Sequence, residues 1–190
     1  MFAPLPSSAA WRQHDARTGF EVACFRDGER GVVAEGVVTA VEDDSPWAIE
    51  YRLRVDEGWH TRSAQITARY PGARRALTLQ SDGLGRWQID GVTAPELDGC
   101  LDVDLAASAF TNALPVHRLA LPVGEGADTP AVYVATDLTV SRLDQHYRRL
   151  ADGTAQRYDY ASRRFDFRAT LDFDESGLIA NYPGLATRTA

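Results

Sequence analysis

Apolar and polar residues alternate strictly along two long segments of the chain. From Trp47 to Val55 every odd-numbered position is apolar, and charged residues occupy most of the positions between them. The same period of two returns from Phe165 to Phe173, where Asp, Arg and Thr separate the apolar side chains. This pattern is typical of strands with one face on a core and the other in water. At about 3.3 Å per residue such strands extend roughly 30 Å, which favours a curved sheet or half-open barrel.

Turn dipeptides divide the chain between these segments. Asp-Gly, which tolerates the positive φ of tight hairpins, recurs at residues 27–28, 82–83, 90–91, 98–99 and 152–153. Alternation and turns together predict strands near residues 20–26, 31–41, 47–56, 59–70, 74–80, 86–90, 100–105, 131–141, 143–150, 155–161, 164–173 and 178–182.

Two segments carry helix signals instead. Either serine of the pair Ser7-Ser8 is placed to cap a short helix that runs to Ala16. Ser108 is placed to cap another around residues 110–114, which Pro115 would stop. Neither is long enough for a helix bundle. We therefore predict an all-β, mainly antiparallel fold: one curved sheet or half-open barrel with one or two short helices, in a single domain over residues 1–190.

A short internal repeat links the two halves of the chain. The two copies share Thr-Leu-x-x-Asp-x-x-Gly, at Thr78, Leu79, Asp82 and Gly85 and again at Thr170, Leu171, Asp174 and Gly177. An old duplication would explain the repeat, with the halves meeting at the predicted loop 121–130. A similar hairpin turn in each half is the simpler explanation, because the match covers only eight residues.

Composition and charge narrow the function classes. The 190 residues carry a net charge of −7 with a pI near 5.1, and all 20 basic residues are Arg. A net-acidic chain is a poor nucleic-acid binder unless its basic residues cluster. The chain has no apolar run of the roughly 18 residues that a membrane helix needs, and its first residues lack the pattern of a signal peptide. We expect a cytoplasmic protein that neither binds nucleic acid nor is integral to a membrane.

Familiar catalytic motifs are absent from the sequence. There is no GxSxG, P-loop, HExxH or EF-hand pattern. Cys24 and Cys100 form no CxxC pair, which argues against a zinc site and a disulfide scaffold. The four histidines are scattered without metal-ligand spacing. We therefore expect no metal and no cofactor, and we assign no catalytic residue.

Two carboxylates stand out in the predicted strand 100–105. Asp102 and Asp104 share one face, opposite Leu101, Val103 and Leu105. Carboxylates two residues apart lie about 6.5–7 Å from each other at the backbone, a spacing that suits a divalent cation or acid–base chemistry on a sugar. Ion pairs with Arg on neighbouring strands are the simpler explanation.

Aromatic and polar residues also share the predicted strands. In a half-open barrel, aromatic walls bury acyl or sugar faces and one or two Arg fix a head group. Packing of the core and rim is the simpler explanation for any one of these residues, and only the set taken together points to a ligand cavity. The candidates in strands are Trp59, Arg62, Trp87, Asp90, Tyr147, Tyr158 and Tyr160.

Four segments resemble a known family. Residues 99–121 read GCLDVDLAASAFTNALPVHRLAL, Trp-His-Thr-Arg occupies 59–62, Trp-Gln-Ile-Asp-Gly occupies 87–91, and Tyr-Pro-Gly-Leu occupies 182–185. In this order, over about residues 20 to 188, the chain is similar to a bacterial family described as "putative glycolipid-binding". The resemblance implies a half-barrel of long antiparallel strands, like that of lipoprotein carriers.

The resemblance also directs attention to two arginines. The family usually has a second Arg in its Trp-Arg-Thr-Arg and Pro-Ile-Arg-Arg segments, where this chain has His60 and His117. A head-group role therefore falls to Arg62 and Arg118.

Two hypotheses follow from these residues. The first is a non-enzymatic protein that binds an amphipathic lipid or glycolipid in the concave face of the sheet. Its wall would include Phe110 beside the Trp and Tyr residues above, Arg62 and Arg118 would bind the head group, and Thr111 and Asn112 would orient polar groups. The alternative is an enzyme that uses Asp102 and Asp104, with His117 as a nearby proton carrier. An adaptor role through an exposed sheet edge and the oligomeric state stay open.

Overall fold

One large antiparallel sheet runs through most of the molecule. The structure is a computed structural model that describes residues 2–15, 17–151, 153 and 155–190. Among these residues fourteen strands join in the order β10-β13-β14-β15-β16-β17-β1-β2-β3-β4-β5-β6-β7-β8. Their bounds are β1 Ser8–Gln13, β2 Thr18–Asp27, β3 Val32–Glu42, β4 Ser45–Val55, β5 Thr61–Tyr70, β6 Ala73–Ser81, β7 Trp87–Ile89, β8 Val92–Thr93, β10 Gly126–Asp128, β13 Gln145–Arg149, β14 Gln156–Ser162, β15 Phe167–Phe173, β16 Ile179–Tyr182 and β17 Ala186–Arg188. The predicted all-β fold is confirmed.

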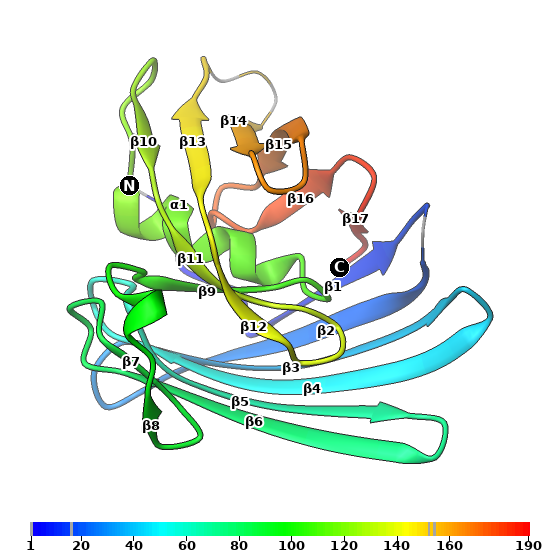
Figure 1. The fold of residues 1–190 in the computed structure, drawn as a ribbon. Helices are drawn as coiled ribbons and strands as arrows, with labels where there is room; N and C mark the ends of the chain where they lie inside the picture. Colours follow the sequence, from blue (N-terminus) through cyan, green and yellow to red (C-terminus); the bar gives the residue numbers. More distant parts are fainter. Residues whose placement is uncertain (1, 16, 152, 154) are drawn as a thin grey trace.

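Strands β2 to β6 form a long curved limb of this sheet (Figure 1). In β4 the predicted alternation holds, because its odd-numbered residues from Trp47 to Val55 are buried while Arg52 and Arg54 are exposed. Strand β15 begins two residues later than the pattern predicts, since Phe165 is 49% exposed in the preceding turn. Its last residues, Leu171 and Phe173, are fully buried.

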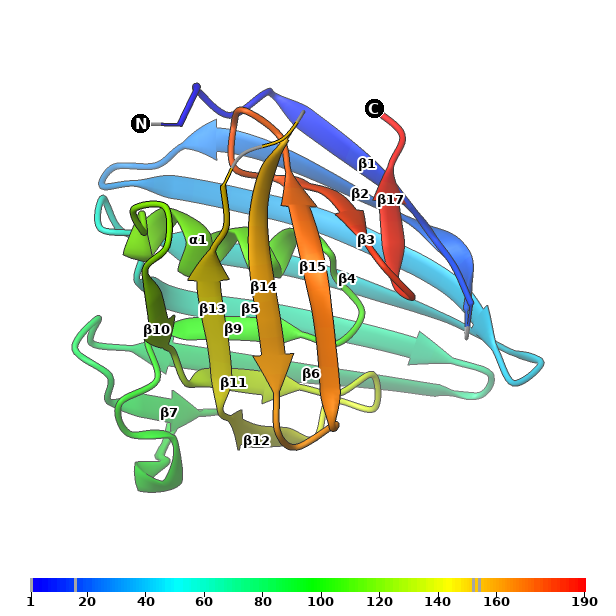
Figure 2. The same ribbon diagram turned by 90° about the horizontal axis from the view of Figure 1, so that it is seen from above.

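The second limb folds back over the first, so that β13, β14 and β15 pass above it (Figure 2). A small sheet in the order β12-β11-β9 and one helical segment lie between the limbs (Figures 1 and 2). These elements are β9 Asp102–Leu105, β11 Ala131–Val134, β12 Val140–Leu143, the 3-10 turn η2 Phe110–Asn112 and the helix α1 Ala113–Leu119; a further 3-10 turn, η1, spans Pro95–Leu97. Phe110, Val103 and Leu114 are buried there. Much of the concave space is therefore filled by the chain itself.

The predicted N-terminal helix is wrong, because residues 8–13 form strand β1. Ala9, Trp11 and Gln13 alternate inward, and the Trp11 indole N–H donates to the carbonyl of Ile179 (2.7 Å). The strand pairs with β17, at the other end of the chain, and with β2. This pairing is not readable from local signals. The predicted end of the helix, Ala16, lies outside the described residues.

The second predicted helix exists but differs in its start and end. Pro115 lies in the first turn of α1, where its missing N–H has no helical partner to lose, so the helix continues to Leu119. Ala120, with φ 43°, ends it in the left-handed conformation. Ser108 is not its cap, since the hydroxyl donates to the buried carboxylate of Glu21.

Other segments differ from the prediction in detail. The predicted strand 131–141 divides into β11 and β12, because Leu138 (φ 67°) lies in a turn between them. The predicted loop 121–130 contains β10, and β8 and β17 were not predicted. The predicted turn at 152–153 lies partly outside the described residues.

The internal repeat corresponds to one turn used twice. The carboxylate of Asp82 accepts the N–H groups of Leu84 and Arg86, and that of Asp174 accepts those of Ser176 and Leu178. In each turn the glycine three residues after the Asp has a positive φ, 93° at Gly85 and 75° at Gly177. A shared turn accounts for the repeat without a duplication.

Candidate functional site

A cavity of about 250 Å³ lies where β9 and η2 meet strands of the second limb. Asp104 comes from β9, Asn112 from η2, Tyr133 from β11, Tyr160 from β14 and Tyr182 from β16. We call it the Asp104 pocket. Asp104, Asn112 and Tyr160, three of the ligand residues predicted from the sequence, line this one cavity.

Asp104 is the charged centre of this pocket. Its carboxylate accepts a hydrogen bond from the side-chain amide of Gln145 (2.5 Å), and the hydroxyl of Thr111 lies 3.5 Å away. Burial raises the pKa of Asp104 to about 6, although these two hydrogen bonds act in the opposite direction. Within the described part of the chain no Arg or His forms an ion pair with it. Asp104 is therefore an ionisable group with spare hydrogen-bonding capacity.

Aromatic rings form the wall beside Asp104. The rings of Tyr160, Tyr182 and Phe167 lie 5.9–6.1 Å apart, centre to centre, and Phe165 lies 5.2 Å from Tyr133. Burial raises the pKa of Tyr160 and of Tyr182 above the usual range, so their hydroxyls stay protonated. The pocket thus offers apolar faces together with neutral hydroxyl groups.

Buried polar residues fix the back of the pocket. The hydroxyl of Tyr147 donates to the side-chain oxygen of Asn112 (3.0 Å). The hydroxyl of Thr111 accepts the N–H of Leu105 (3.2 Å), which ties η2 to the end of β9. Tyr147 and Thr111 therefore position the residues that line the pocket.

The predicted pair of carboxylates does not share this pocket. Asp102 is 1% exposed and binds Arg118 through two hydrogen bonds, from Nε (3.0 Å) and from Nη2 (2.6 Å). Thr129 completes this buried cluster with a hydrogen bond to Asp102 (3.2 Å). The structure thus joins Arg118 to Asp102 and places neither of them against Asp104. The head-group role predicted for Arg118 and the two-carboxylate site both lose their geometric basis.

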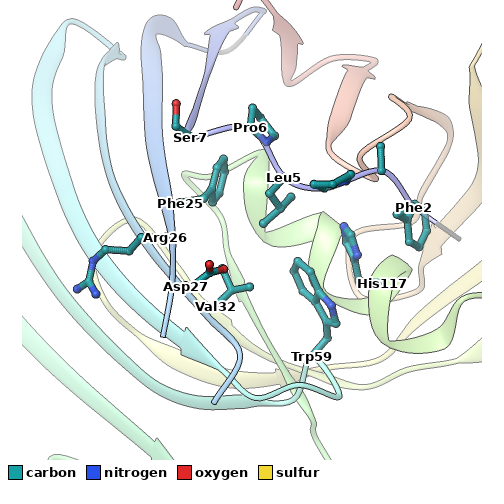
Figure 3. Close-up of a pocket in the computed structure, with 12 residues that line it drawn as sticks. Phe2, Leu5, Pro6, Ser7, Phe25, Arg26, Asp27, Val32, Trp59 and His117 are labelled. Carbon is teal, nitrogen blue, oxygen red and sulfur yellow. The ribbon is translucent and has the colours of Figure 1, made fainter. Parts of the chain in front are cut away.

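A second cavity, of about 660 Å³, lies beyond the other end of the helical segment (Figure 3). His117 of α1 lines it, and the indole of Trp59 stacks on the imidazole with ring centres 3.7 Å apart at an angle of 13°. Burial lowers the pKa of His117 to about 4, so the ring is neutral at pH 7. His117 was predicted as a proton carrier beside the Asp pair, but it belongs to this cavity.

Comparison with known proteins identifies the family. The sequence profile of a family described as "Putative glycolipid-binding" matches residues 8–188. The chain belongs to this family. A crystal structure of a DUF1089 family protein from Pseudomonas aeruginosa is similar to it, with 34% sequence identity and a TM-score of 0.80 over 100% of this chain and 98% of that one. A comparison with curated proteins gives no match. The resemblance seen in the sequence is confirmed.

Several predicted ligand residues of this glycolipid-binding family member have structural positions instead. Trp87 is buried and its indole N–H donates to the carbonyl of Cys100 (2.8 Å), and Phe110 packs between Phe25 and Tyr51. The hydroxyl of the buried Tyr158 accepts a hydrogen bond from Arg149 (3.0 Å). These residues lie in the core and line neither cavity.

Two polar candidates lie at the surface. Asp90 is in the turn between β7 and β8, where its carboxylate accepts the N–H of Thr78 (2.8 Å). Arg62 has a side chain that is 46% exposed and lies 3.5 Å from the carboxylate of Asp56. Arg62 was expected to point into the ligand cavity, but it lies outside both cavities because its position in β5 faces solvent.

Sequence reasoning missed two residues that hold the rim of the Asp104 pocket. Glu21 is fully buried in β2 and accepts hydrogen bonds from the hydroxyl of Tyr51 (2.7 Å), the hydroxyl of Ser108 and the N–H of Ala109 (2.6 Å). Arg17 donates to the carbonyl of Ala106 (2.7 Å). The β2 segment is apolar at even positions too, so no alternation marked Glu21 as inward-facing.

The described residues contain neither a cluster of metal-ligating side chains nor a membrane-spanning helix. No group of three or more His, Cys, Asp or Glu side chains there is arranged to hold a metal ion. No helix in the described ranges is long and apolar enough to cross a membrane.

Proposed function

We propose that the chain is a non-enzymatic binding protein that holds an uncharged, hydroxyl-rich head group of an amphipathic molecule in the Asp104 pocket. The observation that carries this proposal is the half-buried carboxylate of Asp104, which forms no ion pair within the described residues and is walled by tyrosine and phenylalanine rings. Sugar rings offer C–H faces to aromatic side chains and hydroxyls to carboxylates. The description of the family supports a glycolipid as the class of ligand.

The size and charge of the pocket support this assignment. A volume of about 250 Å³ is below the usual range for whole drug-sized ligands, so it suits a head group and not an entire lipid. An anionic head group would meet the charge of Asp104, whereas a hydroxyl would donate to it in a charge-assisted hydrogen bond. Arg17 also lines the pocket, but its guanidinium is already paired with Glu42 (3.1 Å) and with the carbonyl of Ala106. A neutral sugar is therefore favoured over a phosphate.

Native mass spectrometry of freshly purified protein, followed by organic extraction, tests the proposal. We expect an adduct of glycolipid mass that is lost on denaturation. Calorimetric titration with octyl glucoside below its critical micelle concentration then tests the pocket itself. Asp104→Asn removes the charge-assisted hydrogen bond and is expected to weaken binding by about 10- to 100-fold, corresponding to roughly 1.5–3 kcal/mol.

Asp44→Asn is the matched control. Asp44 is exposed in the turn between β3 and β4, with φ 58°, a conformation that Asn also tolerates. This variant should bind octyl glucoside as the wild type does. Equal affinities of wild type and Asp104→Asn would remove the Asp104 pocket as the head-group site.

The raised pKa of Asp104 also favours a second candidate, an enzyme in which this carboxyl acts alone as acid or base. The partner that the sequence suggested, Asp102, is held by Arg118, so a two-carboxylate mechanism lacks its second group. Turnover of a chromogenic nitrophenyl glycoside that disappears in Asp104→Asn would favour the enzyme. Binding without turnover would favour the carrier.

A further inference from the structure

The N-terminal segment, residues 2–7, runs from the side of β2 at Phe25 toward His117 of α1 and forms no strand of the sheet (Figure 3). We call it the N-terminal strap. Pro4 and Pro6 have no N–H to give to a neighbouring strand, and pairing with β2 begins only at Ser8. The strap is held near both ends, by the N–H of Ala3 on the carbonyl of Glu175 (2.8 Å) and by the N–H of Phe25 on the carbonyl of Ser7 (2.9 Å). The cavity of about 660 Å³ is the space that this bridging leaves; we call it the strap cavity.

Apolar side chains dominate the wall of the strap cavity. Leu5 comes from the strap, Phe25 from β2 and Val32 from β3, and the stacked rings of Trp59 and His117 lie opposite them (Figure 3). The volume is within the usual range for small-molecule sites.

The backbone conformation of Trp59 indicates that the position of its side chain is fixed by the surrounding structure. Trp59 has φ 64°, a left-handed conformation that is unfavourable for a bulky residue and persists only where the surroundings hold it. Here the carbonyl of Asp56 accepts the N–H of Trp59 (2.9 Å), and the carboxylate of Asp56 accepts the N–H groups of Gly58 and His60. This turn presents the indole to His117 and to the cavity.

The charged residues around the strap cavity determine which head group a bound alkyl ligand can carry. Arg26 points away from the cavity (Figure 3), and its guanidinium lies 3.6 Å from Glu35. Asp27 pairs in register with Val32 and brings a carboxylate to the lining. His117 is uncharged at pH 7. Among the described lining residues, therefore, a carboxylate head would meet no free cation and would be repelled by Asp27.

We propose that the strap cavity is a second ligand site, which binds an alkyl chain with an uncharged end. It shares no lining residue with the Asp104 pocket and does not depend on a sugar bound there. The proposal therefore goes beyond the head-group function and stands or falls separately from it.

Titration with the linear alcohols 1-hexanol, 1-octanol and 1-decanol tests the proposal, with heat and tryptophan fluorescence as readouts. Burial of each methylene should lower Kd about fourfold. Decanoate should bind roughly tenfold or more weakly than decanol, because its charge would be buried without a partner. Trp59→Phe should remove the fluorescence change and keep the heat.

Two variants and one control variant test the location. Val32→Phe fills the cavity and should abolish the gain in affinity from hexanol to decanol, while Val92→Phe, at a position that is 70% exposed, should keep it. Asp27→Arg changes an exposed residue at the lining and should make decanoate bind more tightly than decanol.

Three results would overturn the proposal: affinity that does not depend on chain length, an unchanged alcohol series in Val32→Phe, or an unchanged preference in Asp27→Arg. Asp104→Asn should not affect the alcohols. Its effect on octyl glucoside alone reports on the proposed function, so the two proposals fail in different measurements.

Discussion

Two carboxylates on strand β9 differ in environment because only one of them has an arginine beside it. Asp102 and Asp104 are two residues apart in β9, yet only Asp102 meets an arginine, Arg118. Arg118 compensates the charge of Asp102 at a buried position, where removing the partner would leave a carboxylate without an ion pair. Asp104 has only hydrogen-bond donors and remains available to a ligand. Because burial disfavours the ionised form of Asp104, this carboxylate lowers the free energy of unfolding at neutral pH.

The raised pKa of Asp104 predicts how the stability of the protein changes with pH when this residue is replaced. The folded pKa of about 6 lies above the ordinary value of about 3.9, so the stability contributed by Asp104 is present below pH 4 and is lost as the pH rises through 6. Asp104→Asn should therefore increase the free energy of unfolding at pH 8, by an amount on the order of 2 kcal/mol, and leave it unchanged near pH 4. Urea denaturation of both proteins from pH 4 to pH 8 measures this difference.

His117 also titrates between pH 4 and pH 8, but it does not affect the difference in stability between wild type and Asp104→Asn. Its folded pKa of about 4 is below the usual value, so its contribution is lost as the pH falls from about 6.5 to 4. That contribution is the same in both proteins and cancels in the difference. A difference between the variants that stays constant from pH 4 to pH 8 would contradict the assignment to Asp104.

At the scale of elements, Gly36 leaves room for a hydrogen bond between β4 and β2, and β2 in turn binds the start of η2. The ring of Tyr51 in β4 lies across Gly36 in β3 and carries its hydroxyl to Glu21 in β2. A Cβ at Gly36 would lie 2.2 Å from the ring carbon that bears this hydroxyl. Glu21 in turn accepts the N–H of Ala109 where η2 begins. Contact between the first limb and the rim of the Asp104 pocket thus depends on the absence of one methyl group.

Gly36→Ala should lower the free energy of unfolding by about 3 kcal/mol, through overpacking and loss of the hydrogen bond between Tyr51 and Glu21. Chemical denaturation measures this loss. In a Tyr51→Leu background the ring is gone, so the same change at Gly36 should cost much less. Equal costs in the two backgrounds would show that the clash with Tyr51 is not the cause.

At the scale of the whole molecule, the sheet is open and has two edges. Strands β8 and β10 are the outermost strands of the large sheet and pair on one side only, whereas β2 to β5 pair on both sides. The N–H groups of an edge strand that face away from its partner have no bond in the sheet. The two outermost strands are therefore the least protected strands of the large sheet.

Hydrogen exchange should rank the strands by their place in the sheet. We expect the slowest amides in β2 to β5 and the fastest in β8 and β10, because an edge strand opens locally while a central strand exchanges through larger unfolding. Exchange followed by mass spectrometry or NMR gives the ranking. Protection of β10 equal to that of β4, varying with protein concentration, would instead show that copies of the chain pair through this edge.

The sequence by itself determined the local elements. Strict alternation predicted β4 and most of β15, Asp-Gly pairs predicted turns, and the family followed from segments such as 99–121. These features depend on residues close together in the chain, where the period of two and the φ angles of turn residues act directly. The same signals misled at residues 8–13, because the strand there depends on β17 at the far end of the chain.

Only the tertiary structure decided which polar and aromatic residues meet. It joined Arg118 to Asp102, placed Trp59 on His117, and brought Tyr182 and Tyr160 around Asp104. Each of these contacts joins separate elements, so no local pattern encodes it. The environment of a buried charge depends on its nearest neighbours in space, and the folding of the second limb over the first selects those neighbours.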